Sequence, residues 1–225
     1  MHAIFAARGI SRFCALALAL LLASCGGGGG GGGGDAGGST PTYSIGGTVS
    51  GLSGTGLVLQ NNGGDSRAVS ASGTYTSPTA VASGATYNIT VFTQPTNPSQ
   101  TCTVSNGSGT VSGANVSNIS ISCTTNSFTV GGTINGSNNL GLTLRLNGNG
   151  TTDLIGLVNG AFAFPAIADG SAYTVAVFLQ PIGQTCGVAN GSGTLGGANV
   201  SSVVVTCVTA GFTIGGTISG LSGAG

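Results

Sequence analysis

Internal repetition constrains the fold of this chain more than any other feature of its sequence. The segment YSIGGTVSG, which begins at Tyr43, recurs as FTVGGTING from Phe128 and as FTIGGTISG from Phe212. The starts lie 85 and 84 residues apart, which is too long for a solenoid repeat and matches the size of one small sandwich domain. The sequence therefore predicts two tandem repeats and the start of a third. Their predicted bounds are residues 43–127 for repeat 1, 128–211 for repeat 2 and 212–225 for the third.

Apolar and polar residues alternate with a period of two inside each repeat. Residues 87–91 read YNITV, residues 119–123 read ISISC, and residues 173–179 read YTVAVFL. Such alternation is typical of half-buried strands, and the many Asn-Gly and Ser-Gly pairs between these segments are typical of turns. Beyond the first 24 residues we find no helical spacing. The sequence predicts an all-β fold in which each repeat is an antiparallel, Ig-like β-sandwich of about seven strands.

The N-terminus has the layout of an export signal. Residues 1–13 carry two arginines and no acid, and residues 14–23 form an apolar run; this run is shorter than the about 20 residues of a membrane-spanning helix. The sequence LASC at positions 22–25 resembles the bacterial lipobox. This resemblance implies a signal peptide over residues 1–24, lipidation of the Cys25 thiol and a membrane anchor outside the cytoplasm. An ordinary signal peptide with an incidental cysteine is the alternative.

A glycine-rich linker, residues 25–42, follows the signal and includes nine consecutive glycines. Gly/Ser chains are flexible coils, and the seventeen residues after the cysteine have a reach of roughly 20–25 Å. A phosphate-cradling loop would need a strand before the glycines and a helix after them, so we interpret the linker as a spacer. Gly26, not Asp, follows Cys25. By resemblance to the sorting rule of Gram-negative lipoproteins, this implies the outer membrane.

The charge that remains after the signal argues against several kinds of partner. The sequence contains no Lys, Glu or Trp, and its one His lies in the signal. The remaining charged residues give a formal charge of −2 and are Arg67, Arg145, Asp35, Asp65, Asp153 and Asp169. Because they form no basic patch, we expect no nucleic-acid partner. Because no basic amphipathic helix is present, we expect lipid contact to come from the acyl anchor.

Short motifs follow one another in the same order in both repeats. Repeat 1 shows GGTV, GLVL, SGTY and GATYNITV from residues 46, 56, 72 and 84, and repeat 2 shows GAFAF and GSAYTVAV from residues 160 and 170. This order resembles the carboxypeptidase-regulatory-like, or prealbumin-like, domain. The resemblance implies a β-sandwich and brings no catalytic residue, and both repeats depart from it by an added segment between two cysteines. The whole layout also resembles the tandem Ig-like repeats that precede a larger domain in bacterial surface lipoproteins, which would make the repeats spacers.

Four cysteines remain besides the predicted lipidation site. Two lie in each repeat with the same spacing of 21, and the repetition favours the pairs Cys102–Cys123 and Cys186–Cys207 among three possible pairings. Export is consistent with disulfides, and each closed loop contributes about 3 kcal/mol in the chain-entropy model. A metal site would need more Cys or His at ligand spacing. We therefore expect disulfides, and no metal or other cofactor.

No arrangement of residues in the sequence predicts catalysis. The many serines and threonines have no His or Lys to activate them. A glycosidase would need two acids that meet across a cleft, whereas the acids here are scattered singly. Asp153 and Asp169 lie near predicted turns, and we interpret them as turn and solubility residues. No D-x-D cluster indicates a calcium site.

The aromatic side chains favour a core over a sugar-stacking platform. Tyr43, Tyr75, Tyr87 and Tyr173 mostly occupy inward positions of the predicted strands. Eight N-x-S/T sequons also occur, which we interpret as a by-product of strands and turns rich in Asn, Ser and Thr. They lie at Asn88, Asn106, Asn115, Asn118, Asn135, Asn149, Asn190 and Asn199.

These observations favour a non-enzymatic, lipid-anchored envelope protein whose repeats act as a spacer or scaffold. An adhesin-like module that binds glycan or protein through loops or a sheet face is the alternative, and a hydrolase is the third hypothesis. An exposed row of aromatic side chains on one sheet would favour adhesion, whereas polar faces would favour the spacer. We expect the repeats to be monomeric.

The last segment, residues 212–225, holds only the first strand of a repeat and its exit turn. One strand cannot bury an apolar face alone. We therefore expect this truncated third repeat to belong to a longer protein. Phe212, Ile214 and Ile218 should be poorly ordered, or should lean on repeat 2 without completing a sandwich.

Overall fold

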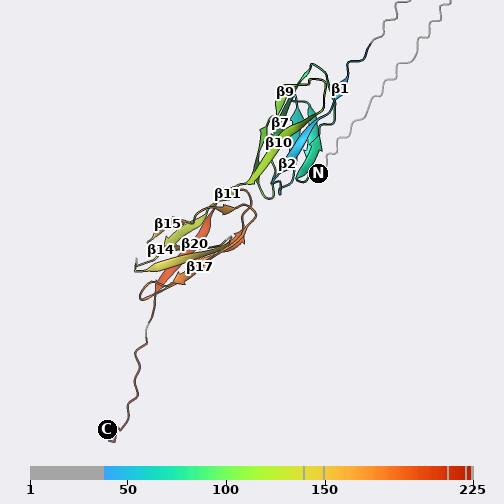
Figure 1. Cartoon of the computed structure of the whole chain (residues 1–225). Coiled ribbons are helices and arrows are strands. Elements are labelled where there is room, and N and C mark those ends of the chain that lie inside the picture. The colour runs from blue at the N-terminus through green and yellow to red at the C-terminus, as the bar shows by residue number, and fades with distance from the viewer. Residues whose placement is uncertain (1–37, 139, 149, 212, 221, 224–225) are drawn as a thin grey trace, which may run out of the picture. The chain divides into compact units, whose positions relative to one another are not determined.

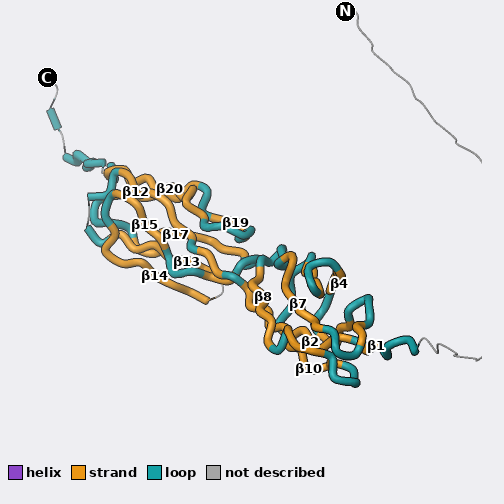
Figure 2. The backbone as a smooth tube through the Cα atoms, turned by 90° about the horizontal axis from the view of Figure 1, so that it is seen from above, coloured by secondary structure: helices purple, strands orange, loops and turns teal. Residues whose placement is uncertain are grey.

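A computed structural model gives the structure of the chain, and it describes residues 38–138, 140–148, 150–211, 213–220 and 222–223. The described residues form strands joined by loops, with no helix among them (Figure 2). The predicted all-β sandwich fold is thereby confirmed. The predicted signal peptide, Cys25, most of the glycine-rich linker and Phe212 lie outside the described residues.

Repeat 1 contains two four-stranded sheets and one small sheet, whose strands can be followed in chain order in Figure 1. The first sheet consists, in order, of β5 (Gly73–Thr76), β2 (Ile45–Ser50), β10 (Val116–Thr125) and β8 (Gln100–Ser105). The second consists of β4 (Asp65–Val69), β3 (Leu57–Asn61), β7 (Thr86–Thr93) and β9 (Ser108–Thr110). The small sheet pairs β1 (Thr42–Tyr43) with β6 (Val81–Ala82).

Repeat 2 has the same three sheets in the same strand order. The first consists of β15 (Gly160–Ala163), β12 (Val130–Asn135), β20 (Val200–Thr209) and β18 (Gln184–Ala189). The second consists of β14 (Gly150–Leu157), β13 (Leu142–Gly148), β17 (Ala172–Leu179) and β19 (Ser192–Thr194). The small sheet pairs β11 (Ser127–Phe128) with β16 (Ile167–Ala168).

One strand pair in the first sheet of each repeat is parallel, which the alternation pattern did not predict. β10 runs parallel to β2, and β20 runs parallel to β12, each with an irregular register near the start of the pair. The backbones approach closely there. A Cβ atom on Gly47 would collide with the carbonyl oxygen of Ile119, and one on Gly132 would collide with that of Val203. The second glycine of the repeated Gly-Gly-Thr sequence is therefore required because the parallel pair leaves no room for a side chain. The first glycine, Gly46 or Gly131, is crowded instead by a carbonyl of the antiparallel neighbour, β5 or β15.

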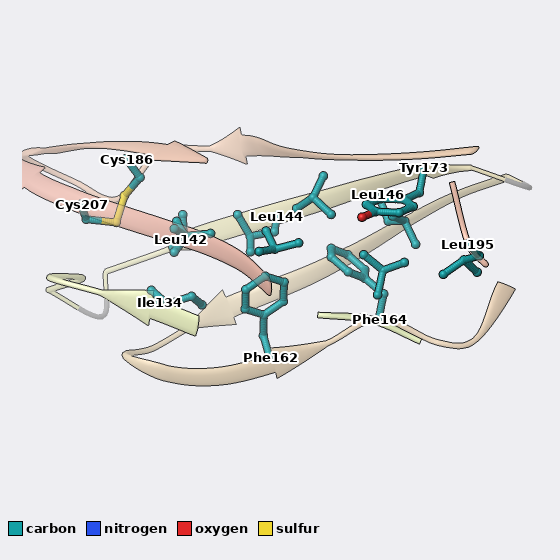
Figure 3. Close-up of a cluster of buried hydrophobic side chains, with 14 residues drawn as sticks. Ile134, Leu142, Leu144, Leu146, Phe162, Phe164, Tyr173, Cys186, Leu195 and Cys207 are labelled. Atoms are coloured by element: carbon teal, nitrogen blue, oxygen red, sulfur yellow. A yellow bond between two sulfur atoms is a disulfide. The ribbon is translucent and has the colours of Figure 1, made fainter. Parts of the chain in front are cut away.

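Each repeat has its own hydrophobic core between its sheets, formed by the alternating residues of the strands. Figure 3 shows the core of repeat 2, where Leu142, Leu144 and Leu146 of β13 point toward Phe162 and Phe164. Full burial of such a side chain stabilises by about 1.5–3 kcal/mol. The buried residues of the repeat 1 core are Ile45, Val49, Leu57, Leu59, Tyr75, Tyr87, Ile89, Cys102, Val111, Ile119, Ile121 and Cys123.

The described part of the third segment forms no strand. Residues 213–220 are irregular, and the side chains of Ile214 and Ile218 are exposed. Of the two outcomes expected for this segment, packing against repeat 2 is therefore not observed.

Candidate functional site

The two predicted disulfides are present and join neighbouring strands of one sheet. Cys102 is bonded to Cys123, and Cys186 is bonded to Cys207. In both pairs the cysteines are direct cross-strand partners, so each bond ties an edge strand, β8 or β18, to a central strand. Figure 3 shows the second bond beside the core of repeat 2. Because disulfides persist in oxidising compartments, they indicate a protein outside the cytoplasm.

A glutamine side chain brackets the first cysteine of each pair. The Oε1 atom of Gln94 accepts from the N–H of Cys102 at 2.8 Å, and its Nε2 atom donates to the carbonyl of the same residue at 3.1 Å. Gln180 makes the same two bonds with Cys186. The sequence analysis missed this role, although a Gln-Pro pair recurs upstream of the cysteines in both repeats.

A second glutamine, Gln100, closes the loop that precedes β8. Its side chain is buried, and its Oε1 atom accepts from the N–H groups of Ser53 and Gly54, both at 2.8 Å. Its Nε2 atom donates to the carbonyl of Gly51 at 2.8 Å. The backbone N–H of Gln100 also donates to the carbonyl of Pro95. The loop from Pro95 to Gln100 is therefore held at both ends.

Asp169 lies next to this loop, at the contact between the two repeats. Its Oδ2 atom accepts from the N–H of Ser99 in repeat 1 at 2.6 Å, and its Oδ1 atom accepts from the N–H of Gly197 in repeat 2 at 2.7 Å. The backbone N–H of Asp169 donates to the carbonyl of Asn126 at 2.8 Å. The N–H donors of Ser99 and Gly197 hold the pKa of Asp169 below its usual range, although burial opposes the shift.

This position corrects the interpretation of Asp169 as a solubility residue. Asp169 does follow β16 in a turn, but its side chain is only 6% exposed. A buried carboxylate is costly unless hydrogen bonds satisfy it, and here two backbone N–H groups do so. One sequence signal existed: repeat 1 has Ser83, which is uncharged, at the corresponding position.

Asp153 also differs from its prediction, because it lies within β14 and not near a turn. Its carboxylate forms a two-point ion pair with the guanidinium of Arg145 on β13, at 2.6 and 2.7 Å. The hydrogen bond with Arg145 lowers the pKa of Asp153. The same guanidinium lies 3.4 Å from the ring centre of Phe178. This is a partly exposed surface ion pair.

The aromatic residues divide between core and surface. Tyr75, Tyr87 and Tyr173 are buried, as the sequence predicts. The rings of Phe92 and Phe178 are exposed by 65% and 56%. They are the exposed aromatic side chains of the described residues, one in each repeat, and they form no row on one sheet.

Several sequon asparagines hold the backbone of the fold. The side-chain oxygens of Asn115 and Asn199 accept from backbone N–H groups at the starts of the first sheets. The side-chain nitrogens of Asn106 and Asn190 donate to backbone carbonyls of β10 and β20. These four amides are thus engaged within the repeats.

Repeat 2 has an apolar end surface that repeat 1 lacks. Leu140, Leu179 and Ile182 line a hollow of about 470 Å³ and are exposed by 51%, 57% and 77%. The corresponding residues of repeat 1 are Thr55, Thr93 and Thr96, which are also exposed. The two repeats therefore present different chemistry at the same place in the fold.

Two kinds of feature are absent from the part of the chain that the structure describes. No three His, Cys, Asp or Glu side chains gather in the described residues in a way that could hold a metal ion. The same residues include no helix that is long and apolar enough to cross a membrane.

Comparison with known proteins gives no family for the chain. No family model matches it, and no curated protein matches it. The Bacillus anthracis TIE protein is similar in structure, with a TM-score of 0.48 and 11% identity over 76% of this chain, which spans 34% of that protein. The major pilin protein (T-13) from Streptococcus pyogenes serotype GAS131465 has a TM-score of 0.26 and 12% identity, with coverage of 76% of this chain and 98% of that one. Likeness at this level carries no argument about function.

Proposed function

We propose that this chain is a lipid-anchored envelope protein whose two repeats act as a spacer. The observation that carries the proposal is the serial arrangement of two closed sandwiches after the lipobox-like sequence and the glycine-rich linker. Each sandwich has its own core and its own disulfide. A spacer must stay folded without a ligand, and a disulfide supports this by constraining the unfolded chain.

The charged residues support a non-enzymatic role. Asp169 binds backbone N–H groups, and Asp153 binds Arg145. The carboxylate of Asp65 accepts from both the N–H and the hydroxyl of Thr79. Each of the three acids in the described residues thus has a structural partner that accounts for its place in the fold. The proposed anchor is Cys25, in the outer membrane, with the linker as the tether.

The spacer proposal predicts how far the repeats hold the C-terminus from the membrane. β10 and β20 have ten residues each, so a repeat is roughly 30 Å long in the strand direction. We would measure energy transfer from a membrane dye to a fluorophore at the C-terminus of the anchored protein. A variant without residues 43–127 should show a clearly shorter distance, and the matched variant without residues 128–211 should show the same shortening. An unchanged distance in both variants would contradict the spacer.

The apolar end of repeat 2 favours a second candidate function, a module that binds a protein. Leu140, Leu179 and Ile182 offer an uncharged hollow, and exposed patches of this kind are typical of interaction sites. The matched variant carries the Thr residues of repeat 1 at all three positions, so the sandwich itself should tolerate it. Loss of a protein-array signal in this variant would support binding, whereas an equal signal, or none with the wild type, would count against it.

A further inference from the structure

Two structural features meet at the contact between the repeats, and each occurs in only one of the two repeats among the described residues. One is the carboxylate of Asp169 in the turn after β16, and the other is the loop from Pro95 to Gln100. We propose that this loop is a docking surface for the Asp169 turn, and that the pairing couples the two repeats into one body. The coupling is independent of the spacer proposal, because two uncoupled repeats would still hold a C-terminus away from a membrane.

The two carboxylate oxygens of Asp169 bind different repeats. One oxygen binds the N–H of Ser99 in repeat 1, and the other binds the N–H of Gly197 in repeat 2. Both donors belong to the backbone, so their positions do not depend on flexible side chains. Hydrogen bonds to a charged acceptor are stronger than bonds between neutral groups. The carboxylate therefore links one loop of each repeat at defined points.

The loop side is shaped to receive the turn. The carbonyl of Ser99 accepts from the N–H of Asn126, whose own carbonyl accepts from the N–H of Asp169. Beside these bonds, a Cβ atom on Gly170 would lie 3.4 Å from the Cβ of Pro98. Gly170 has a φ of +79°, which is strained for other residues. Glycine thus allows the turn, as Gly84 does at a φ of +83° in repeat 1, and the turn lies in van der Waals contact with the loop at Pro98.

Comparison of the two repeats shows that neither feature is needed to form a sandwich. The turn of repeat 1 has Ser83, whose N–H donates to the carbonyl of Pro41, but it has no carboxylate. The loop of repeat 2 has two residues between Pro181 and Gln184, where repeat 1 has four. Both loops are nevertheless closed by the same backbone bond from Gln to Pro. The longer loop and the acid occur together where the repeats meet. This indicates that the loop of repeat 1 and the Asp169 turn of repeat 2 serve the contact between the repeats.

Nuclear relaxation of ¹⁵N in the chain from Gly26 to Gly225 tests the coupling. In the wild type both repeats should report the same slow tumbling. Asp169→Ser, which introduces the residue of repeat 1, should shorten the rotational correlation time of each repeat by up to about twofold, because each repeat is about half of the body. Asp153→Ser is the matched control, since it removes an acid of repeat 2 away from the contact, and it should tumble like the wild type.

A second variant keeps the test decisive if Asp169→Ser disturbs the loop around Gly197. Residues 96–99, TNPS, are replaced by Ile-Gly, the shorter loop of repeat 2, which leaves Asp169 and Gly197 unchanged. This variant should uncouple the repeats while the amide spectra of both cores remain those of the wild type. Tumbling that equals the wild type in both variants would overturn the proposal, whatever the membrane-distance experiment shows.

Discussion

The hydroxyl of Tyr75 is a buried polar group in the core of repeat 1 that has no hydrogen-bond partner among the described residues. The side chain is 5% exposed. Tyr75 lies opposite Gly47, and Phe162 lies opposite Gly132 at the corresponding position of repeat 2. Tyr75→Phe therefore removes the oxygen and gives repeat 1 the ring that repeat 2 already accommodates.

The expected gain follows from the cost of an unsatisfied buried group, which is about 1–3 kcal/mol. Tyr75→Phe should raise the free energy of unfolding of repeat 1 by roughly 1 kcal/mol. For a domain of this size, that corresponds to an increase in melting temperature of about 4–8 °C.

The same residue predicts a loss of stability in alkali. Burial raises the pKa of Tyr75 to about 12, whereas an unfolded tyrosine titrates near 10. The folded state thus holds the phenol proton more tightly than the unfolded state does. The stability of repeat 1 is therefore unaffected by this group below pH 10, and it falls as the pH rises from 10 toward 12. At pH 11 the loss of stability is on the order of 1 kcal/mol. Tyr75→Phe should remove this part of the pH dependence.

Calorimetry of the chain from Gly26 onward at pH 8 and pH 11 would measure both effects. The wild type is compared with Tyr75→Phe and with Phe162→Tyr, which places a second hydroxyl in repeat 2 and should add an alkaline loss of stability in that repeat. A Tyr75→Phe protein that is less stable than the wild type at pH 8, or equally sensitive to alkali, would show that the hydroxyl has a partner or reaches water.

Other changes test the disulfides, the buried glutamine and the anchor. Replacing Cys102 and Cys123 together by Ala opens a loop closed over 21 residues and should cost repeat 1 about 3 kcal/mol; calorimetry that showed equal losses in both repeats would contradict this. Gln100→Ala leaves two backbone N–H groups and a carbonyl without their partner and should cost about 2–3 kcal/mol in denaturant unfolding. Gln100→Glu keeps the acceptor but puts an anionic oxygen in place of the donor that faces the carbonyl of Gly51, so it should cost at least as much. Cys25→Ser should abolish incorporation of labelled fatty acid, and normal labelling would place the lipid elsewhere.

The strands and the disulfides could be predicted from the sequence because both depend on local or repeated patterns. Alternation with a period of two reports which side chains face the core, as Tyr87 and Ile89 illustrate. The cysteine pairing could be predicted because each repeat contains two cysteines at the same spacing, which favours a disulfide within each repeat. Cys102 and Cys123 are indeed cross-strand neighbours.

The parallel pair and the glutamine contacts could not be predicted in this way. Alternation is the same for parallel and antiparallel strands, so the pattern of β2 does not reveal that β10 runs beside it in the same direction. The second glycine of the Gly-Gly-Thr sequence carried the signal, but its cause lies far along the chain, in the carbonyl of Ile119 for Gly47 and of Val203 for Gly132. Gln100 similarly looks like an ordinary polar residue until the fold surrounds it with backbone groups.

Strand periodicity and internal repetition are properties of the chain alone, so a series of disulfide-closed β-sandwiches can be predicted without coordinates. The roles of the few charged residues, in contrast, depend on which segments the fold brings together. Asp169 and Ser99 are 70 residues apart, and a carboxylate in a turn is a solvated group unless another segment supplies donors and excludes water. The same acid type became a surface ion pair at Asp153, because there the neighbouring strand supplied Arg145. The two aspartates therefore differ in role because the fold buries Asp169 among backbone N–H groups and leaves Asp153 at the surface beside Arg145.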